Sequence, residues 1–160
     1  MREKIGIVVC SRTDSKRCPN KPFIKLNGKY LISHLLDRLI ATGLPVYLAV
    51  PKEEHALYEK KLEGYINWKN VFLFGGSKND PLKRTHQVAK HYDLKHVIRV
   101  CHDKIFISYR QIEYFLTRYL EGLGKSRPEM VAAARQALAK AKPGQLNYGS
   151  GGNGSQAHLA

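Results

Sequence analysis

One short segment near the start of the chain limits the fold more than any other. Residues Ile5–Cys10 read Ile-Gly-Ile-Val-Val-Cys, a run with no charged side chain and three β-branched residues in its centre. Such a run is typical of a strand that is buried on both faces, which is the usual environment in a parallel sheet. We therefore predict that this segment is the first and central strand of a parallel sheet.

The chain that follows alternates between short apolar runs and segments with helical spacing. Strands are predicted at 46–50, 71–74 and 97–101, and helices at 53–62, 82–92 and 109–120. A further helix is predicted over 31–40, where apolar residues recur at helical spacing and Gly43 suits the helix end. This order predicts βαβ units with right-handed crossovers and therefore an α/β fold. The helix over 109–120 is expected to bury Ile112, Phe115, Leu116, Tyr119 and Leu120 on one face.

The C-terminal part differs in composition from the rest. Residues 125–142 are rich in alanine and predict a last helix. Residues 143–160 carry a Gly/Ser/Asn run, and this segment has too little apolar surface to offset the conformational entropy that it would lose on folding. A chain of 160 residues with 43% hydrophobic content supplies one core. We therefore divide it into a folded, nucleotide-binding-type domain over 1–124, an Ala-rich helix over 125–142 and a disordered tail over 143–160.

Charge and cysteine content narrow the choice of partners. The chain has 27 Lys and Arg against 13 Asp and Glu, a formal net charge of +14, which favours polyanions such as nucleotides, nucleic acids or phosphorylated sugars. No apolar run approaches the roughly 20 residues that a membrane helix needs. Cys10, Cys18 and Cys101 lack the spacing of a metal site or a redox motif. We expect a cytoplasmic protein with reduced thiols and no membrane partner.

Two polar segments follow predicted strands and carry candidate binding residues. Ligands of parallel sheets bind outside the carboxyl ends of the strands, so the loop after Cys10 and the segment His102-Asp103-Lys104 should face one crevice. Four cations lie in that loop, and they suit a triphosphate with about four negative charges. On composition alone, a solvated basic surface loop is the alternative. The four cations are Arg12, Lys16, Arg17 and Lys21.

Three blocks of residues stand in a fixed order along the chain. The first is Arg12-x4-Arg17-x-Pro19-Asn20-Lys21-Pro22 with a following Asn27-Gly28-Lys29, the second runs over 74–84, and the third over 97–103. Together they resemble the cytidylyltransferases that make CMP-activated acidic sugars, most closely the spore-coat polysaccharide branch. Asn20 stands where that family has glycine, and asparagine tolerates a positive φ next best.

The resemblance implies a Rossmann-like, three-layer parallel sheet of the nucleotide-diphospho-sugar transferase type, truncated to its N-terminal part. It implies transfer of CMP from CTP to a sugar hydroxyl with release of pyrophosphate, and Mg²⁺ as the cofactor. Arg12, Lys21 and Asp103 would be the catalytic residues, with Asp103 as the metal ligand. The residues implied to bind the nucleotide are Ser11, Arg12, Ser15, Arg17, Lys21, Asp80 and Arg84.

A second function stays open at this point. The chain could be a noncatalytic nucleotide- or nucleic-acid-binding module derived from the same fold. The excess of positive charge favours it, and so do His102, Lys104 and Ile105, which differ from the family's Gly-Asp-x-Pro around Asp103. The sequence is also compatible with a homodimer. It favours CTP and a sugar as binding partners over nucleic acid.

Overall fold

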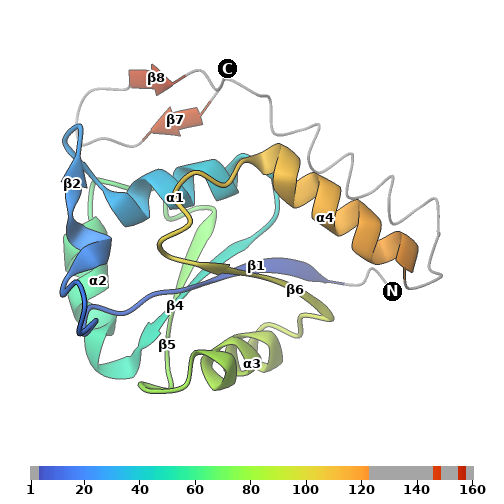
Figure 1. Cartoon of the computed structure of the whole chain (residues 1–160), viewed down its shortest axis with the longest axis horizontal. Helices are drawn as coiled ribbons and strands as arrows, with labels where there is room; N and C mark the ends of the chain where they lie inside the picture. The colour runs from blue at the N-terminus through green and yellow to red at the C-terminus, as the bar shows by residue number, and fades with distance from the viewer. Residues whose placement is uncertain (1–3, 123–145, 149–154, 158–160) are drawn as a thin grey trace.

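Four parallel strands form the central sheet of the computed structural model, which describes residues 4–122, 146–148 and 155–157. They are β1 (Ile5–Cys10), β4 (Val46–Pro51), β5 (Val71–Gly76) and β6 (His96–Cys101), in the order β5-β4-β1-β6 (Figure 1). The α-helices are α1 (Leu31–Ile40), α2 (His55–Leu62), α3 (Pro81–His91) and α4 (Tyr109–Gly122). The predicted α/β fold with an inner first strand is confirmed.

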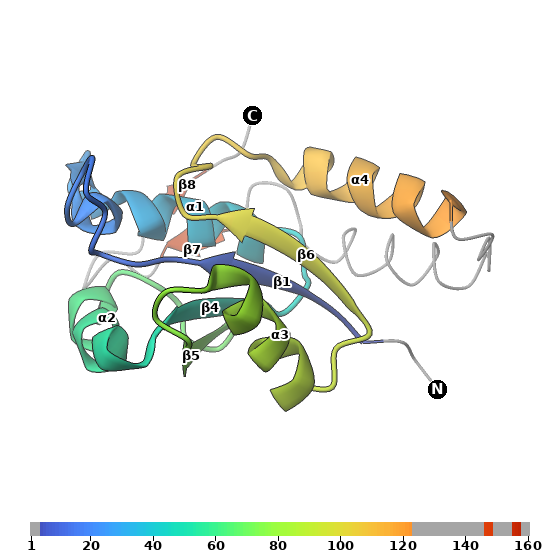
Figure 2. The same cartoon turned by 60° about the horizontal axis from the view of Figure 1, so that its bottom comes forward.

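Helices cover both faces of this sheet (Figure 2). Residues of α1, α2 and α4 share one core cluster with Ile7 and Val9 of β1, whereas α3 packs against Val8 and Cys10 on the other face. Alternate residues of a strand point to opposite faces. Because both faces are covered, every position of β1 from Ile7 onward must be apolar, which explains the continuous run in the sequence.

Successive strands are added on one side of β1 up to β5, and β6 is then added on the other side. From β1 the chain moves outward through β4 to β5, and it then returns to place β6 on the other side of β1. In open α/β sheets, ligands bind at such a switch point, outside the carboxyl ends of the strands. Cys10 pairs with Cys101 in the sheet, so Ser11 and His102 are the next residues on two neighbouring strands. The fold therefore brings the two predicted polar segments to one place.

The segment between β1 and α1 contains more regular structure than the sequence predicts. After a short 3₁₀ turn, η1 (Lys21–Phe23), the strands β2 (Lys25–Leu26) and β3 (Lys29–Tyr30) pair antiparallel. The predicted turn residues Asn27 and Gly28 join them with φ values of 49° and 78°, which asparagine and glycine adopt in tight hairpins. Strands of two residues are too short to give a sequence pattern.

The buried face of α4 is narrower than predicted. Ile112, Leu116 and Leu120 are buried, but Phe115 and Tyr119 are 61% and 49% exposed. The three buried residues recur at every fourth position, so α4 contacts the core along a single stripe. The prediction that Phe115 and Tyr119 are core residues is wrong, because their positions lie beside this stripe.

The remaining elements lie close to their predicted ranges. A 3₁₀ turn, η2 (Lys52–Glu54), precedes α2, and Gly43 after α1 has the positive φ of 72° that suits a helix end. The predicted helix over 125–142 lies outside the described residues. Where the sequence predicts a disordered tail, residues 146–148 and 155–157 pair as the short strands β7 (Leu146–Tyr148) and β8 (Ser155–Ala157). Among the described residues, no helix has both the length and the apolar character that a membrane crossing requires.

Candidate functional site

The loop after β1 and the turn after β6 meet at the switch point. Lys21 Nζ lies 3.5 Å from Asp103 Oδ2, and the two side chains are 36% and 44% exposed. We call residues 11–22 the cationic loop. Its last cation and the aspartate after β6 thus face each other, which is the juxtaposition that the sequence predicts.

The cations of this loop lie where a solvated ligand could reach them. Arg12, Lys16 and Arg17 are exposed, and Lys21 is half-buried. Arg12 Nε lies 3.5 Å from Asp14 Oδ1, so it is paired in the same loose way as Lys21 is with Asp103. Exposed ion pairs of this kind contribute about 0–1 kcal/mol each. A polyphosphate can therefore replace either carboxylate as the partner of its cation, because little ion-pair free energy is lost.

The start of the cationic loop is tied to the interior. Ser11 is buried, and its Oγ lies 2.7 Å from the Tyr58 hydroxyl of α2. The Thr13 N–H donates to Glu54 Oε2 at 3.0 Å, and the Asn20 N–H donates to the Thr13 carbonyl at 2.9 Å. Asn20 has a φ of 55°, as its position at a family glycine leads one to expect. The Ser11 hydroxyl therefore faces Tyr58, and its role as a nucleotide contact stays a prediction.

Arg84 lies beneath the crevice and is 1% exposed. Its Nη1 donates to the carbonyls of Ser11 (2.8 Å), directly after β1, and Ala49 (3.3 Å), within β4. Its Nε and Nη2 donate to the carbonyls of Ser77 (2.9 Å) and Lys78 (3.1 Å) in the loop after β5. All three guanidinium nitrogens are thus engaged by backbone oxygens. Arg84 thus joins β1, β4 and the loop after β5, and a nucleotide-binding role for it stays a prediction.

Asp80 and Ser15 make local contacts in the structure. Asp80 is the N-cap of α3, and its Oδ1 accepts the Lys83 N–H at 2.8 Å. Ser15 Oγ accepts the Cys18 N–H at 3.4 Å within the cationic loop. Both contacts shape the backbone around the crevice, and a nucleotide-binding role for either residue stays a prediction.

His102 lies at the crevice, although it is not among the site residues that the sequence predicts. Burial lowers the pKa of His102, while the charge of Asp103 opposes this shift and Lys21 adds to it. The imidazole is therefore neutral at neutral pH, and the charges that act on it are those of the site. Its position directly after β6 and before Asp103 is the sequence signal that could have identified it.

Asp103 itself is charged at neutral pH. Burial tends to raise its pKa, but the charge and the hydrogen bond of Lys21 outweigh this effect, and the pKa lies below its ordinary value. Among the described residues, no group of three or more His, Cys, Asp or Glu side chains could hold a metal ion. A single exposed carboxylate fits Mg²⁺, which keeps its waters and binds mainly through substrate phosphates. Asp103 is the residue that would hold such an ion.

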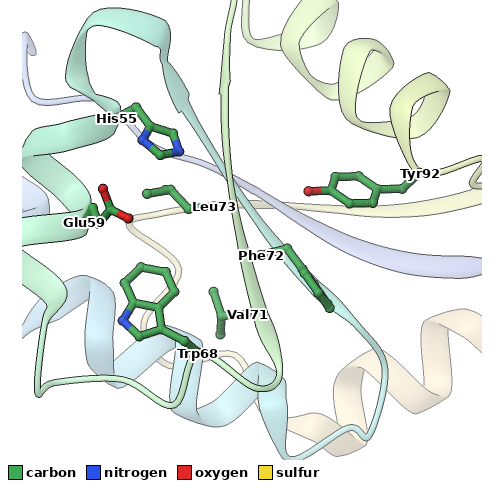
Figure 3. Close-up of a pocket in the computed structure, with 7 residues that line it drawn as sticks. All are labelled: His55, Glu59, Trp68, Val71, Phe72, Leu73 and Tyr92. Atoms are coloured by element: carbon green, nitrogen blue, oxygen red, sulfur yellow. The ribbon is translucent and has the colours of Figure 1, made fainter.

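A separate groove of about 380 Å³ lies at the opposite edge of the sheet, along β5 (Figure 3). Phe72 and Tyr92 lie on one side of the strand and the other lining residues on the other side. The groove shares no lining residue with the predicted site, so it is distinct from the crevice. Its lining residues are His55, Glu59, Trp68, Val71, Phe72, Leu73 and Tyr92.

A parallel sheet with a cation-rich loop at its switch point defines an α/β domain suited to anionic ligands at its carboxyl edge. A family model described as cytidylyltransferase matches residues 6–141 of the chain. The protein belongs to this cytidylyltransferase family.

Individual relatives match parts of the chain. An uncharacterized protein of Methanocaldococcus jannaschii is 31% identical over 121 residues, which are 71% of this chain and 48% of that protein. A cytidylyltransferase structure from Leptospira borgpetersenii serovar Hardjo-bovis matches with a TM-score of 0.62 and 22% identity, over 74% of this chain and 49% of that chain.

A third relative is a CMP:2-keto-3-deoxy-manno-octonic acid synthetase solved in complex with CTP. It matches with a TM-score of 0.59 and 21% identity, over 74% of this chain and 48% of that chain. At such identities the two solved structures establish the α/β fold. The chain spans about half the length of these relatives.

Proposed function

We propose that this protein binds CTP together with Mg²⁺ and transfers CMP to the hydroxyl of an acidic sugar, with release of pyrophosphate. The observation that carries the proposal is the approach of Lys21 to Asp103 at the switch point. Membership in the cytidylyltransferase family supports the nucleotide, and the CTP-bound relative supports the base. The spore-coat polysaccharide branch and a cytoplasmic location are finer parts of the same proposal, and they rest on the sequence.

The proposed binding step is an exchange of ion pairs. The triphosphate takes the place of Asp14 beside Arg12 and of Asp103 beside Lys21, and each exchanged pair is weak and exposed. Asp103, which is ionised at neutral pH, then becomes free to hold the metal ion. When bound, Mg²⁺ supplies charge neutralisation on the phosphates.

The proposed chemical step needs alignment and charge stabilisation more than a covalent group. The sugar hydroxyl oxygen forms a bond to the α-phosphorus and loses its proton to solvent. The bond from the α-phosphorus to the oxygen that bridges to the β-phosphate breaks in line with this attack, and pyrophosphate leaves with that electron pair. Arg12 and Lys21 stabilise the negative charge that develops on the leaving pyrophosphate. Arg17, which is exposed in the same loop, adds a further cation for the triphosphate.

Thermal stability in the presence of nucleotides tests the binding step. CTP with Mg²⁺ should raise the melting temperature more than ATP with Mg²⁺ does, and Lys21→Ala should abolish the shift. Lys25→Ala is the matched control, because the Lys25 ammonium lies 3.1 Å from the Tyr65 hydroxyl and has no contact with Asp103. Equal small shifts for all nucleotides would point to unspecific attraction of charge and against the proposal.

Pyrophosphate release tests the chemical step. The wild-type protein should release pyrophosphate from CTP in the presence of an acidic sugar, and Asp103→Asn should stop the release while it leaves metal-free CTP binding in place. Failure of the wild-type protein to turn over a panel of acidic sugars, combined with tight CTP binding, would favour the noncatalytic binding module. The imidazole of His102 at the crevice is the feature that favours this second candidate.

A further inference from the structure

Two side chains that follow β4 hold the cationic loop from its interior side. Glu54 Oε2 accepts the backbone N–H of Thr13 at 3.0 Å, and the Tyr58 hydroxyl lies 2.7 Å from Ser11 Oγ. Glu54 ends η2 and Tyr58 lies one turn further on, in α2. Neither residue is among those that the sequence predicts for the site.

The Tyr58 contact is fully enclosed. Tyr58 and Ser11 are both buried, so each hydroxyl depends on the other for a hydrogen bond. A buried polar group that loses its partner costs more than an exposed one, because water cannot replace the bond. Burial raises the pKa of Tyr58, with the Ser11 hydrogen bond opposing this effect. The phenol therefore stays protonated and keeps its contact over the whole neutral range.

The two contacts bracket the first cation of the loop. Ser11 and Thr13 are the residues on either side of Arg12, so Tyr58 and Glu54 fix the backbone before and after it. Thr13 in turn accepts the N–H of Asn20, and Asn20 directly precedes Lys21. Two sets of hydrogen bonds, one from Tyr58 of α2 and one from Glu54 of η2, thus hold the backbone next to both cations of the proposed triphosphate site.

We infer that Glu54 and Tyr58 are positioning residues, which hold the cationic loop in the arrangement that a triphosphate needs before the ligand arrives. A preformed loop saves the ordering cost that binding would otherwise have to meet. The inference rests on the proposed function for the identity of the ligand, whereas the anchoring of the loop can be measured without any ligand.

Trypsin measures the anchoring directly. Lys16 and Arg17 are exposed cleavage sites inside the loop, and Lys69 is an exposed site on another part of the molecule that serves as internal standard. Glu54→Ala and Tyr58→Phe should each raise cleavage after Lys16 and Arg17 about fivefold relative to Lys69, the factor expected for one lost hydrogen bond. Glu54→Gln should stay close to wild type, because the amide oxygen still accepts the Thr13 N–H. Glu59→Ala, on the exposed side of α2, is the matched control.

The affinity for CTP with Mg²⁺, measured by calorimetry well below the melting temperature of every variant, connects the anchors to binding. Glu54→Ala and Tyr58→Phe should weaken it measurably, and by no more than the factor by which they raise loop cleavage, since the open fraction of the loop must be reordered before CTP binds. Glu54→Gln should restore it.

Several outcomes would overturn the inference. One is unchanged loop cleavage in both variants, and another is an equal rise at Lys69, which would indicate general destabilisation. Faster loop cleavage with unchanged CTP affinity would also overturn it. If the wild-type protein binds no CTP, the proposed function fails, and the cleavage ratios alone then decide whether Glu54 and Tyr58 anchor the loop.

Discussion

Arg84 and Asp37 are both charged and almost fully buried, but their surroundings differ. Arg84, beneath the crevice, donates hydrogen bonds to four backbone carbonyls. Asp37, on α1 beneath the β2-β3 hairpin, is 4% exposed and forms an ion pair with Lys29 of that hairpin. One turn earlier, the buried Ser33 hydroxyl has no hydrogen-bond partner in the described part of the chain. The two regions therefore bury charge with very different numbers of partners.

This difference has an electrostatic consequence. Burial raises the pKa of Asp37 to about 6, and the hydrogen bond and charge of Lys29 reduce this effect without cancelling it. Arg84 remains a cation because a guanidinium does not lose its proton in proteins. A buried charge with a complete set of partners can organise a site, whereas one with a single strong partner is driven toward its neutral form.

The largest expected effect is the loss of Arg84. Arg84→Met removes four hydrogen bonds from a charged donor and leaves buried carbonyl oxygens without a donor, so the free energy of unfolding should fall by about 3–5 kcal/mol. Urea unfolding at neutral pH measures it. Arg118→Met, which removes only an exposed ion pair with Glu121, should change stability by less than about 1 kcal/mol. If the free energy of unfolding falls by less than about 1 kcal/mol in Arg84→Met, the four hydrogen bonds of Arg84 do not stabilise the fold more than an exposed ion pair does.

A smaller effect is expected at Asp37, and it depends on pH. Because the pKa is raised from 3.8 to about 6 in the folded protein, the neutral form is favoured on folding. The resulting stability is fully present below pH 4 and is lost as the pH rises to about 6, by up to about 3 kcal/mol. Asp37→Asn should flatten the curve of unfolding free energy against pH in this window. An unchanged slope in the variant would show that another group is responsible.

The smallest effect concerns His102, a half-buried group that sharpens the comparison. Its pKa is lowered mainly by burial, and Lys21 lowers it further. In a proton NMR titration, the midpoint of His102 should lie below the ordinary range of histidine, and Lys21→Ala should move it upward. Lys25→Ala should leave it in place. If the midpoint falls in Lys21→Ala, the ammonium of Lys21 does not act on this imidazole as the geometry indicates.

The fold and part of the site could be predicted from the sequence, for identifiable reasons. The doubly buried β1 gives a continuous apolar run, and the carboxyl ends of neighbouring parallel strands must lie together, so the approach of Asp103 to the cationic loop followed from the order of the strands. Asn20 could be predicted to adopt a positive φ because it stands where the resembling family has glycine, and asparagine tolerates this conformation better than most residues.

The rest depended on tertiary packing. Arg84 falls in a resembling block, but no local pattern reveals that its guanidinium faces backbone carbonyls. Glu54 and Tyr58 reach the loop from a different element, and such long-range contacts have no sequence period. The prediction that Phe115 and Tyr119 are buried fails because helical spacing gives the direction of an apolar face and says nothing about how wide the buried stripe is.

The pairing of β1 with β6 also governs when the crevice can form. Cys10 and Cys101 are neighbours in the sheet, but all of α1, β4, α2, β5 and α3 lie between them along the chain. Parallel pairings between such distant segments form slowly. The entropy of closing a large loop is lost before any stabilising contact between the two strands can form. We therefore expect ligand-binding competence to be acquired late in refolding, after the helices and the local hairpin.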